Sequence, residues 1–190
     1  MQTATDITQA LDEELRTLSF LRDSFPMLTD WGVKDESILI HSLGCNYLAA
    51  LGRHLGFWAI NECPFRVSGG NTIRPDAVWW NKDDRQVMFL AEFERYQTGQ
   101  DAKLAAKARN LVETYAAIDP KPVVALLLSW VFAGTDLKGA RAAGTVAYSG
   151  FAADGNSWIG GMSGEHRFLH YFAIFGREGE NTKLLRIQKA

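Results

Sequence analysis

Apolar residues recur at helical spacing in two segments of the first third of the chain. Between residues 5 and 20 they form a single stripe, and Pro26 then interrupts the pattern. A second helix is expected to begin near Asp35, which is a good N-cap residue, and to end at Gly56, a common C-terminal residue of helices. The pattern therefore predicts an N-terminal helical extension over about 5–25, followed by a first core helix.

Shorter apolar runs bounded by turn residues come next, and they predict strands. Three such runs lie at 57–67, 72–80 and 86–96. Residues 100–117 are rich in Ala, Leu, Lys and Arg and contain no Gly or Pro, which predicts a helix. The continuous apolar run 123–130 predicts a strand that is buried on both faces. The order over 35–130 is thus helix, three strands, helix, strand.

The remainder of the chain is less regular. The Gly- and Ala-rich stretch 134–164 shows no period that assigns it to an element, whereas 166–187 predicts a C-terminal hairpin that turns at 176–180. We expect one α/β domain over 1–190, with a central mixed sheet flanked by helices and a core at about 35–130.

Composition and charge narrow the class of protein. The chain has 190 residues, of which 47% are hydrophobic, and a formal net charge of -2, so no strong basic field indicates a nucleic-acid partner. Cys45 and Cys63 lack the spacing of a metal site and are interpreted as reduced core residues. The N-terminal residues do not resemble a signal peptide, and no apolar run is long enough to cross a bilayer. We expect a cytoplasmic protein without membrane contact.

Three carboxylates are expected to converge on the sheet. Alternate residues of a strand share a face, so Glu92 and Glu94 lie on the same side of the third predicted strand, about 6.8 Å apart. Asp76 lies on the preceding strand, where a hairpin brings it beside Glu92. Buried carboxylates so close repel each other, and a hard divalent cation with oxygen ligands, Mg²⁺ or Mn²⁺, relieves that repulsion. The alternative is a solvated sheet face, but the apolar surround at 87–91 favours a central strand.

This combination resembles the PD-(D/E)XK superfamily of restriction-endonuclease-like nucleases. The resemblance covers about 35–130 and depends on the order of elements, on Pro-Asp opening the second strand, and on the acidic doublet of the third strand. It implies metal-assisted hydrolysis of DNA phosphodiester bonds, with Asp76 as the first metal ligand and Glu92 as the second. The family lysine would fall at Glu94, which is a departure from the family pattern. Some members carry that lysine on the next helix, where Lys103 and Lys107 lie four residues apart.

Two further acids are candidates for an additional metal ligand. Many members of the family use an acid on the first core helix, and Glu36 occupies that place, although an acid at a helix start also has an ordinary dipole role. Glu62, in the first predicted strand, is the other candidate. None of the four histidines, His41, His54, His166 and His170, has the partner spacing of a zinc site. His166 and His170 are four residues apart but lie in no zinc motif, so the sequence does not favour any of the four as a ligand.

Three functions remain open at this point. The first is a Mg²⁺-dependent nuclease acting on DNA, and the second is a catalytically inactive module of the same fold that binds nucleic acid or protein. The two differ in one geometric requirement, because an active enzyme needs Lys103 or Lys107 within hydrogen-bonding reach of Glu92. The third is a homodimeric structural protein that uses its aromatic residues, 12% of the chain, at an interface.

Overall fold

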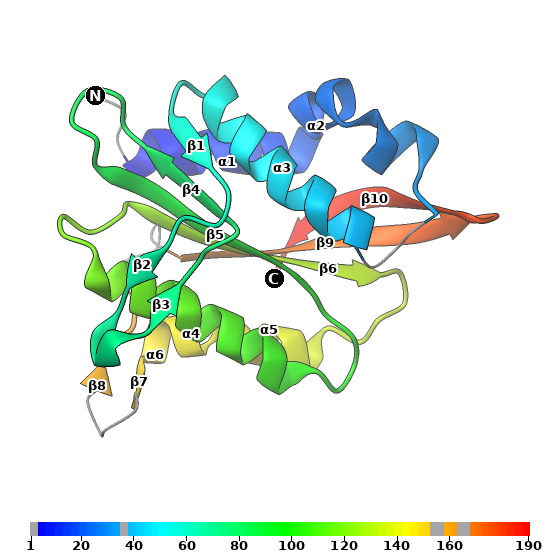
Figure 1. Ribbon diagram of the computed structural model, residues 1–190. Helices are drawn as coiled ribbons and strands as arrows, with labels where there is room; N and C mark the ends of the chain where they lie inside the picture. Colours follow the sequence, from blue (N-terminus) through cyan, green and yellow to red (C-terminus); the bar gives the residue numbers. More distant parts are fainter. Residues whose placement is uncertain (1–3, 35–37, 153–157, 163–167) are drawn as a thin grey trace.

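A six-stranded mixed sheet forms the centre of the computed structural model, which describes residues 4–34, 38–152, 158–162 and 168–190 (Figure 1). Its spatial order is β1-β4-β5-β6-β9-β10. The strands are β1 (Trp58–Ile60), β4 (Ala77–Trp80), β5 (Val87–Arg95), β6 (Val124–Phe132), β9 (Phe168–Glu178) and β10 (Asn181–Lys189). β5 to β6 and β6 to β9 are parallel pairs, whereas the other neighbours are antiparallel. The α/β class and the mixed central sheet expected from the sequence are confirmed.

Helices cover both faces of this sheet (Figure 1). One face carries α1 (Ala4–Thr17), α2 (Ser19–Ser24) and α3 (Ile38–His54), together with a π-helical turn, η1 (Met27–Trp31). The other face carries α4 (Asp101–Ala117), α5 (Lys138–Gly144) and α6 (Val146–Ser149). β6 lies between the two layers, which explains why its sequence is an uninterrupted apolar run instead of an alternating one.

Two small antiparallel pairs lie outside the central sheet. β2 (Phe65–Arg66) pairs with β3 (Thr72–Ile73) around a 3₁₀ turn, η2 (Ser68–Gly70), and β7 (Phe151–Ala152) pairs with β8 (Trp158–Ile159). The stretch 134–164, to which the sequence pattern assigned no element, therefore contributes α5, α6, β7 and β8 in its described part.

The prediction of one continuous strand at 57–67 was wrong, as was that at 72–80. Each region is divided between the central sheet and the β2–β3 pair. In the first region the chain bends at Glu62, whose φ is +54°, and Pro64 has no N–H group to donate to a strand ladder. In the second region Pro75 has the same effect, so that β4 begins only after Asp76.

The other predicted elements agree with the structure to within a few residues. The helix at 100–117 is α4, the strands at 86–96 and 123–130 are β5 and β6, and the C-terminal hairpin is β9 with β10, turning at Gly179. The N-terminal helix is divided in two because Leu18 adopts a left-handed conformation, with φ at 57°. Asp35, the expected N-cap of the first core helix, lies outside the described residues.

Two glycines allow α3 to lie close to the sheet. A Cβ atom added at Gly44 would come within 2.0 Å of the Phe93 ring, and one added at Gly52 would come within 2.5 Å of the Trp79 indole. Since real Cβ contacts are never that short, any side chain there would push the helix away from β4 and β5. The close approach brings the buried side of α3 against the strands that carry Asp76 and Glu92.

None of the helices in the described ranges combines the length and the apolar character that a membrane crossing needs.

Candidate functional site

β5 directs two carboxylates toward α4 from the middle of the sheet. Leu90, on the same face of the strand, packs in the apolar cluster formed with α4, whereas Phe93 packs in the opposite cluster formed with α3. Glu92 and Glu94 therefore point away from α3, as strand alternation predicts. Both are buried, and Glu92 is only 1% exposed. Carboxylates at such positions need partners, since an unpaired buried charge is costly.

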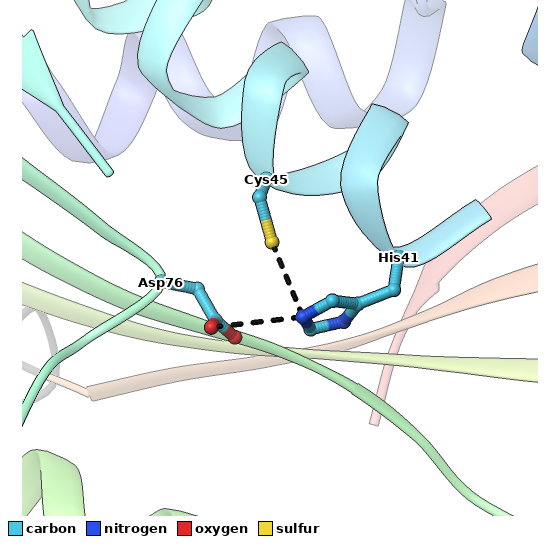
Figure 2. Close-up of side chains that lie close together, drawn as sticks. All are labelled: His41, Cys45 and Asp76. Carbon is cyan, nitrogen blue, oxygen red and sulfur yellow. Dashed lines mark hydrogen bonds and ion pairs between the residues drawn. The ribbon is translucent and has the colours of Figure 1, made fainter. Parts of the chain in front are cut away.

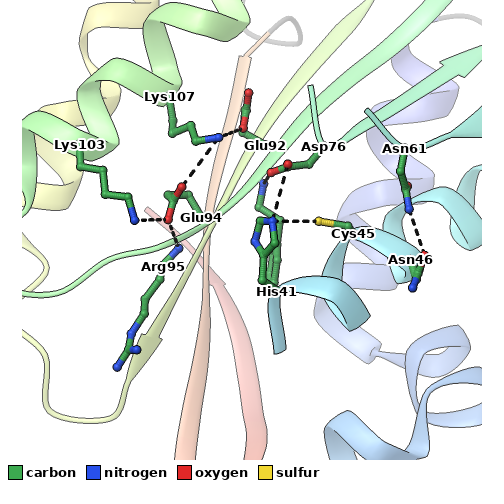
Figure 3. A network of polar contacts seen from close by, with 11 residues as sticks. His41, Cys45, Asn46, Asn61, Asp76, Glu92, Glu94, Arg95, Lys103 and Lys107 are labelled. Carbon is green, nitrogen blue, oxygen red and sulfur yellow. Dashed lines mark hydrogen bonds and ion pairs between the residues drawn. The ribbon is translucent and has the colours of Figure 1, made fainter. Parts of the chain in front are cut away.

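α4 supplies those partners with matched spacing (Figure 3). Lys107 Nζ lies 2.8 Å from Glu92 Oε2, and Lys103 Nζ lies 2.8 Å from Glu94 Oε1. A step of four residues along a helix is about 6 Å, close to the roughly 6.8 Å between alternate residues of a strand. Because α4 returns along the sheet after β5, the order of the pairs is reversed, so the later lysine meets the earlier glutamate.

The two ion pairs differ in their exposure to solvent. The Lys107 side chain is 27% exposed and lies against a carboxylate that water scarcely reaches, whereas the Lys103 side chain is 55% exposed. Lys107 Nζ also lies 3.8 Å from Glu94 Oε2, so it is placed between both acids. The geometric requirement for an active enzyme is met by Lys107. Its catalytic role remains a prediction.

Glu92 is in an environment that disfavours its charged form. Burial and the nearby charge of Asp76 raise the pKa of Glu92 to about 8, although Lys107 opposes that change. Burial by itself lowers the pKa of Lys107, but Glu92, Asp76 and Glu94 outweigh it, so the Lys107 pKa is raised and the ammonium keeps its charge. Glu92 Oε1 is buried and has no hydrogen-bond donor among the described residues. Such an oxygen fits the coordination of a cation.

Asp76 is fixed in position at the point where the chain enters β4. Its Oδ2 accepts a hydrogen bond of 2.7 Å from the backbone N–H of Phe93, which holds the carboxylate against β5. Asp76 is near enough to Glu92 to hydrogen-bond with it when one of the two carries a proton. Asp76 and Glu92 therefore do come together and are candidates to bind a shared cation. The expected group of three carboxylates is not present among the described residues, because Glu94 pairs with Lys103 instead.

A group of side chains not expected from the sequence lies on the α3 side of Asp76 (Figure 2). His41 Nε2 is 3.8 Å from Asp76 Oδ1 and 3.6 Å from Cys45 Sγ. Among the described residues these three form a group whose potential ligand atoms all lie within 4.8 Å of one another. The available signal in the sequence was the spacing of His41 and Cys45, which is one helical turn. Interpreting Cys45 as a core residue concealed it.

The other candidate residues have different positions. Glu36 lies outside the described residues, and so does His166. Glu62 is exposed, and its charge is one of those that raise the pKa of the Cys45 thiol. His170 is buried and lies 3.1 Å from the hydroxyl of Ser129, and burial, followed by the charge of Arg141, lowers its pKa to about 4. A neutral buried histidine paired with a hydroxyl is a core arrangement.

Glu94 stands where the resemblance would place a lysine. Besides its ion pair with Lys103, its Oε1 accepts a hydrogen bond of 2.9 Å from the backbone N–H of Arg95. The Arg95 guanidinium lies on the other face of the sheet, 4.9 Å from the centre of the Trp130 ring. Glu94 therefore has local partners of its own and holds Lys103 near the site.

No family model, no curated protein and no solved structure matches this chain. The interpretation of the site consequently depends on its own geometry. That geometry contains two adjacent buried carboxylates, an ammonium group hydrogen-bonded to one of them, and an imidazole and a thiol beside the other. Such a set can bind cations and can stabilise negative charge on a substrate.

Proposed function

We propose that the protein is a divalent-metal-dependent nuclease that hydrolyses phosphodiester bonds in DNA. Asp76 and Glu92 would hold the ion, which is Mg²⁺ or Mn²⁺ because both ligands are carboxylates. The observation that carries the proposal is the 2.8 Å ion pair between Lys107 and Glu92, together with the position of Asp76 beside Glu92. The sequence of elements around these residues, helix, strands, helix, strand, supports the same reading by analogy with PD-(D/E)XK nucleases.

Each residue has a distinct task in this proposal. The ion, when bound, supplies Lewis acidity and lowers the pKa of a water molecule. Asp76, held by the Phe93 N–H, presents its Oδ1 in a fixed direction. Lys107 orients the attacking water or neutralises charge on the phosphate, and its partly exposed ammonium can reach both solvent and Glu92. Glu94 Oε2 lies 3.8 Å from the Lys107 ammonium and helps to hold it beside Glu92.

A second candidate is a catalytically inactive module that binds nucleic acid or protein. One observation favours it, namely that a carboxylate, Glu94, occupies the family lysine position and ties Lys103 into an ion pair. In that case Lys107 and Glu92 would stabilise the fold without taking part in chemistry. The net charge of -2 also limits the affinity that electrostatics alone can give for DNA.

Binding and cleavage measured on the same DNA separate the two candidates. Anisotropy of a labelled duplex in EDTA reports binding, and gel analysis after addition of Mg²⁺ or Mn²⁺ reports cleavage. The proposed nuclease cuts, and Lys107→Met lowers the cleavage rate at least about 100-fold, in line with losing one charge-stabilising group. Lys34→Met is the matched control, because it removes an exposed ion pair with Glu180. Binding without cutting would favour the inactive module.

A further inference from the structure

We propose that His41, Cys45 and Asp76 form a binding site for a transition-metal ion of the zinc class. Two of the residues come from α3 and Asp76 comes directly before β4, and Figure 2 shows their polar atoms turned toward one another. This inference goes beyond the proposed nuclease activity: it shares Asp76 with the proposed Mg²⁺ site, but ion binding here requires neither Glu92 nor Lys107. It also gives the first core helix metal ligands other than Glu36, the candidate that the family resemblance implied there.

Two of the three separations between the ligand atoms are close to those around one tetrahedral ion. Zinc bonds of about 2.3 Å to sulfur, 2.0–2.1 Å to nitrogen and 2.0–2.2 Å to oxygen place tetrahedral sulfur and nitrogen ligands roughly 3.6 Å apart, and nitrogen and oxygen ligands roughly 3.4 Å apart. The Cys45 Sγ to His41 Nε2 distance is 3.6 Å, and the His41 Nε2 to Asp76 Oδ1 distance is 3.8 Å. The Cys45 Sγ atom and the Asp76 carboxylate lie within 4.8 Å of each other, so this pair closes by up to roughly 1.2 Å when all three atoms share one tetrahedral ion.

The donor set selects the kind of ion. Thiolate and imidazole ligands favour zinc and related transition metals, whereas Mg²⁺ prefers oxygen ligands alone. Cys45 and Asp76 are buried, and the His41 side chain is 40% exposed, so the group opens to solvent on the histidine side. Three protein ligands with one open side are typical of a catalytic metal site, in which water takes the fourth position.

Neighbouring groups hold the ligands in place. In the amide orientation that satisfies its surroundings, Asn61 donates hydrogen bonds to the backbone carbonyls of Cys45, at 3.1 Å, and of Asp76, at 3.2 Å. One side chain thus joins the two segments that carry the ligands. Gly44, adjacent to Cys45, allows the close approach of α3 to Phe93, whose N–H group fixes Asp76 Oδ2 and leaves Oδ1 directed toward His41. Outer contacts of this kind pre-organise metal ligands.

Cobalt titration of the full chain tests the site directly. Co²⁺ takes the place of zinc and gives a near-ultraviolet charge-transfer band when a thiolate is a ligand. With the protein kept reduced and free of oxygen, we expect one Co²⁺ per chain with that band, and displacement of the cobalt by Zn²⁺. Cys45→Ser removes the band, and His41→Gln keeps it while weakening the affinity at least roughly 10-fold. Cys63→Ser, which changes the other free cysteine, leaves the titration unchanged.

Three results would overturn the site: no thiolate band in the wild-type protein, a band that survives Cys45→Ser, or a band that is lost with Cys63→Ser. Circular dichroism of each variant verifies folding, and His41→Gln provides a test at a more exposed position should Cys45→Ser not fold. Glu92→Gln is expected to keep the cobalt band although it removes a residue of the proposed nuclease. A chain that cuts DNA with Mg²⁺ but gives no cobalt band would therefore refute this site alone.

Discussion

The ammonium group of Lys107 lies 2.8 Å from the carboxylate of Glu92, which is almost completely buried in the middle of the central sheet. Four residues of α4 and two residues of β5 span nearly equal lengths, so two lysines can face two glutamates. Their order is reversed because α4 runs back along the sheet after β5. Glu92 has one charged partner and one buried oxygen that accepts no hydrogen bond from the described part of the chain, and this arrangement is the structural basis of the proposed metal site.

Removal of the two lysines should have unequal effects on stability. Lys107→Met removes the charged partner of Glu92, which takes up a proton at neutral pH because its pKa is about 8. We expect the free energy of unfolding to fall by about 2 kcal/mol, less than the roughly 3 to 5 kcal/mol for a change that leaves a buried charge unpaired. Lys103→Met removes a pair in which only the lysine is mostly exposed, but Lys107 still lies 3.8 Å from Glu94, so the change should cost less, about 1 kcal/mol. Urea unfolding in EDTA measures both. Equal losses would show that the pair with Glu92 is no stronger than a surface contact.

The raised pKa of Glu92, about 8, predicts a particular dependence of stability on pH in the absence of metal. Between pH 4.5 and about pH 8, Glu92 of the folded protein keeps a proton that the same glutamate of the unfolded chain, with a pKa of 4.5, has released. The contribution of Glu92 to stability is therefore fully present below about pH 4.5 and is lost as the pH rises through 8.

Comparison with Glu92→Gln, which cannot titrate, isolates this effect. We expect the wild-type protein to lose stability relative to the variant between pH 5 and pH 8, by at most about 1.4 kcal/mol per pH unit. Urea unfolding of both proteins in EDTA at four or five pH values gives the difference in slope. Parallel stability curves for the two proteins would mean that Glu92 is ionised throughout this range.

Gly44 should tolerate no side chain. Its added Cβ would overlap the Phe93 ring, so Gly44→Ala is expected to destabilise the fold by roughly 1 to 3 kcal/mol, as overpacking does. The same change moves α3 away from Asp76 and should weaken Co²⁺ binding. Gly160→Ala is the matched control, since its added Cβ meets nothing within 4 Å. Thermal unfolding compares the two variants, and equal melting temperatures would contradict the close packing.

Strand alternation was sufficient to predict that Glu92 and Glu94 share one face, and the composition of 100–117 was sufficient to predict the helix α4. The contact between Lys107 and Glu92 could not be predicted, only named as a requirement for an active enzyme. It depends on the position of α4 along the sheet, which the sequence pattern does not determine. The break between β1 and β2 was missed because the apolar content of 57–67 outweighed Pro64 in the pattern.

The role of α3 was harder to predict. His41 and Cys45 are one turn apart, but a histidine and a cysteine on an apolar helix face are ordinary core residues in most sequences. What distinguishes them is the position of Asp76, which comes from a segment 31 residues after Cys45 and is brought to α3 by the short strand β4. Such a long-range contact leaves no period in the local sequence.

A cleavage assay of the purified wild-type protein and of Glu92→Gln tests whether Glu92 belongs to a catalytic metal centre. The substrates are supercoiled plasmid, linear duplex and single-stranded DNA. We expect the wild-type protein to cut at least one of these substrates with Mg²⁺ or Mn²⁺, EDTA to stop the reaction, and the variant to be inactive although folded. A folded wild-type protein that cuts none of them, or a variant that cuts as fast as the wild type, would contradict the claim that Glu92 belongs to a catalytic metal centre.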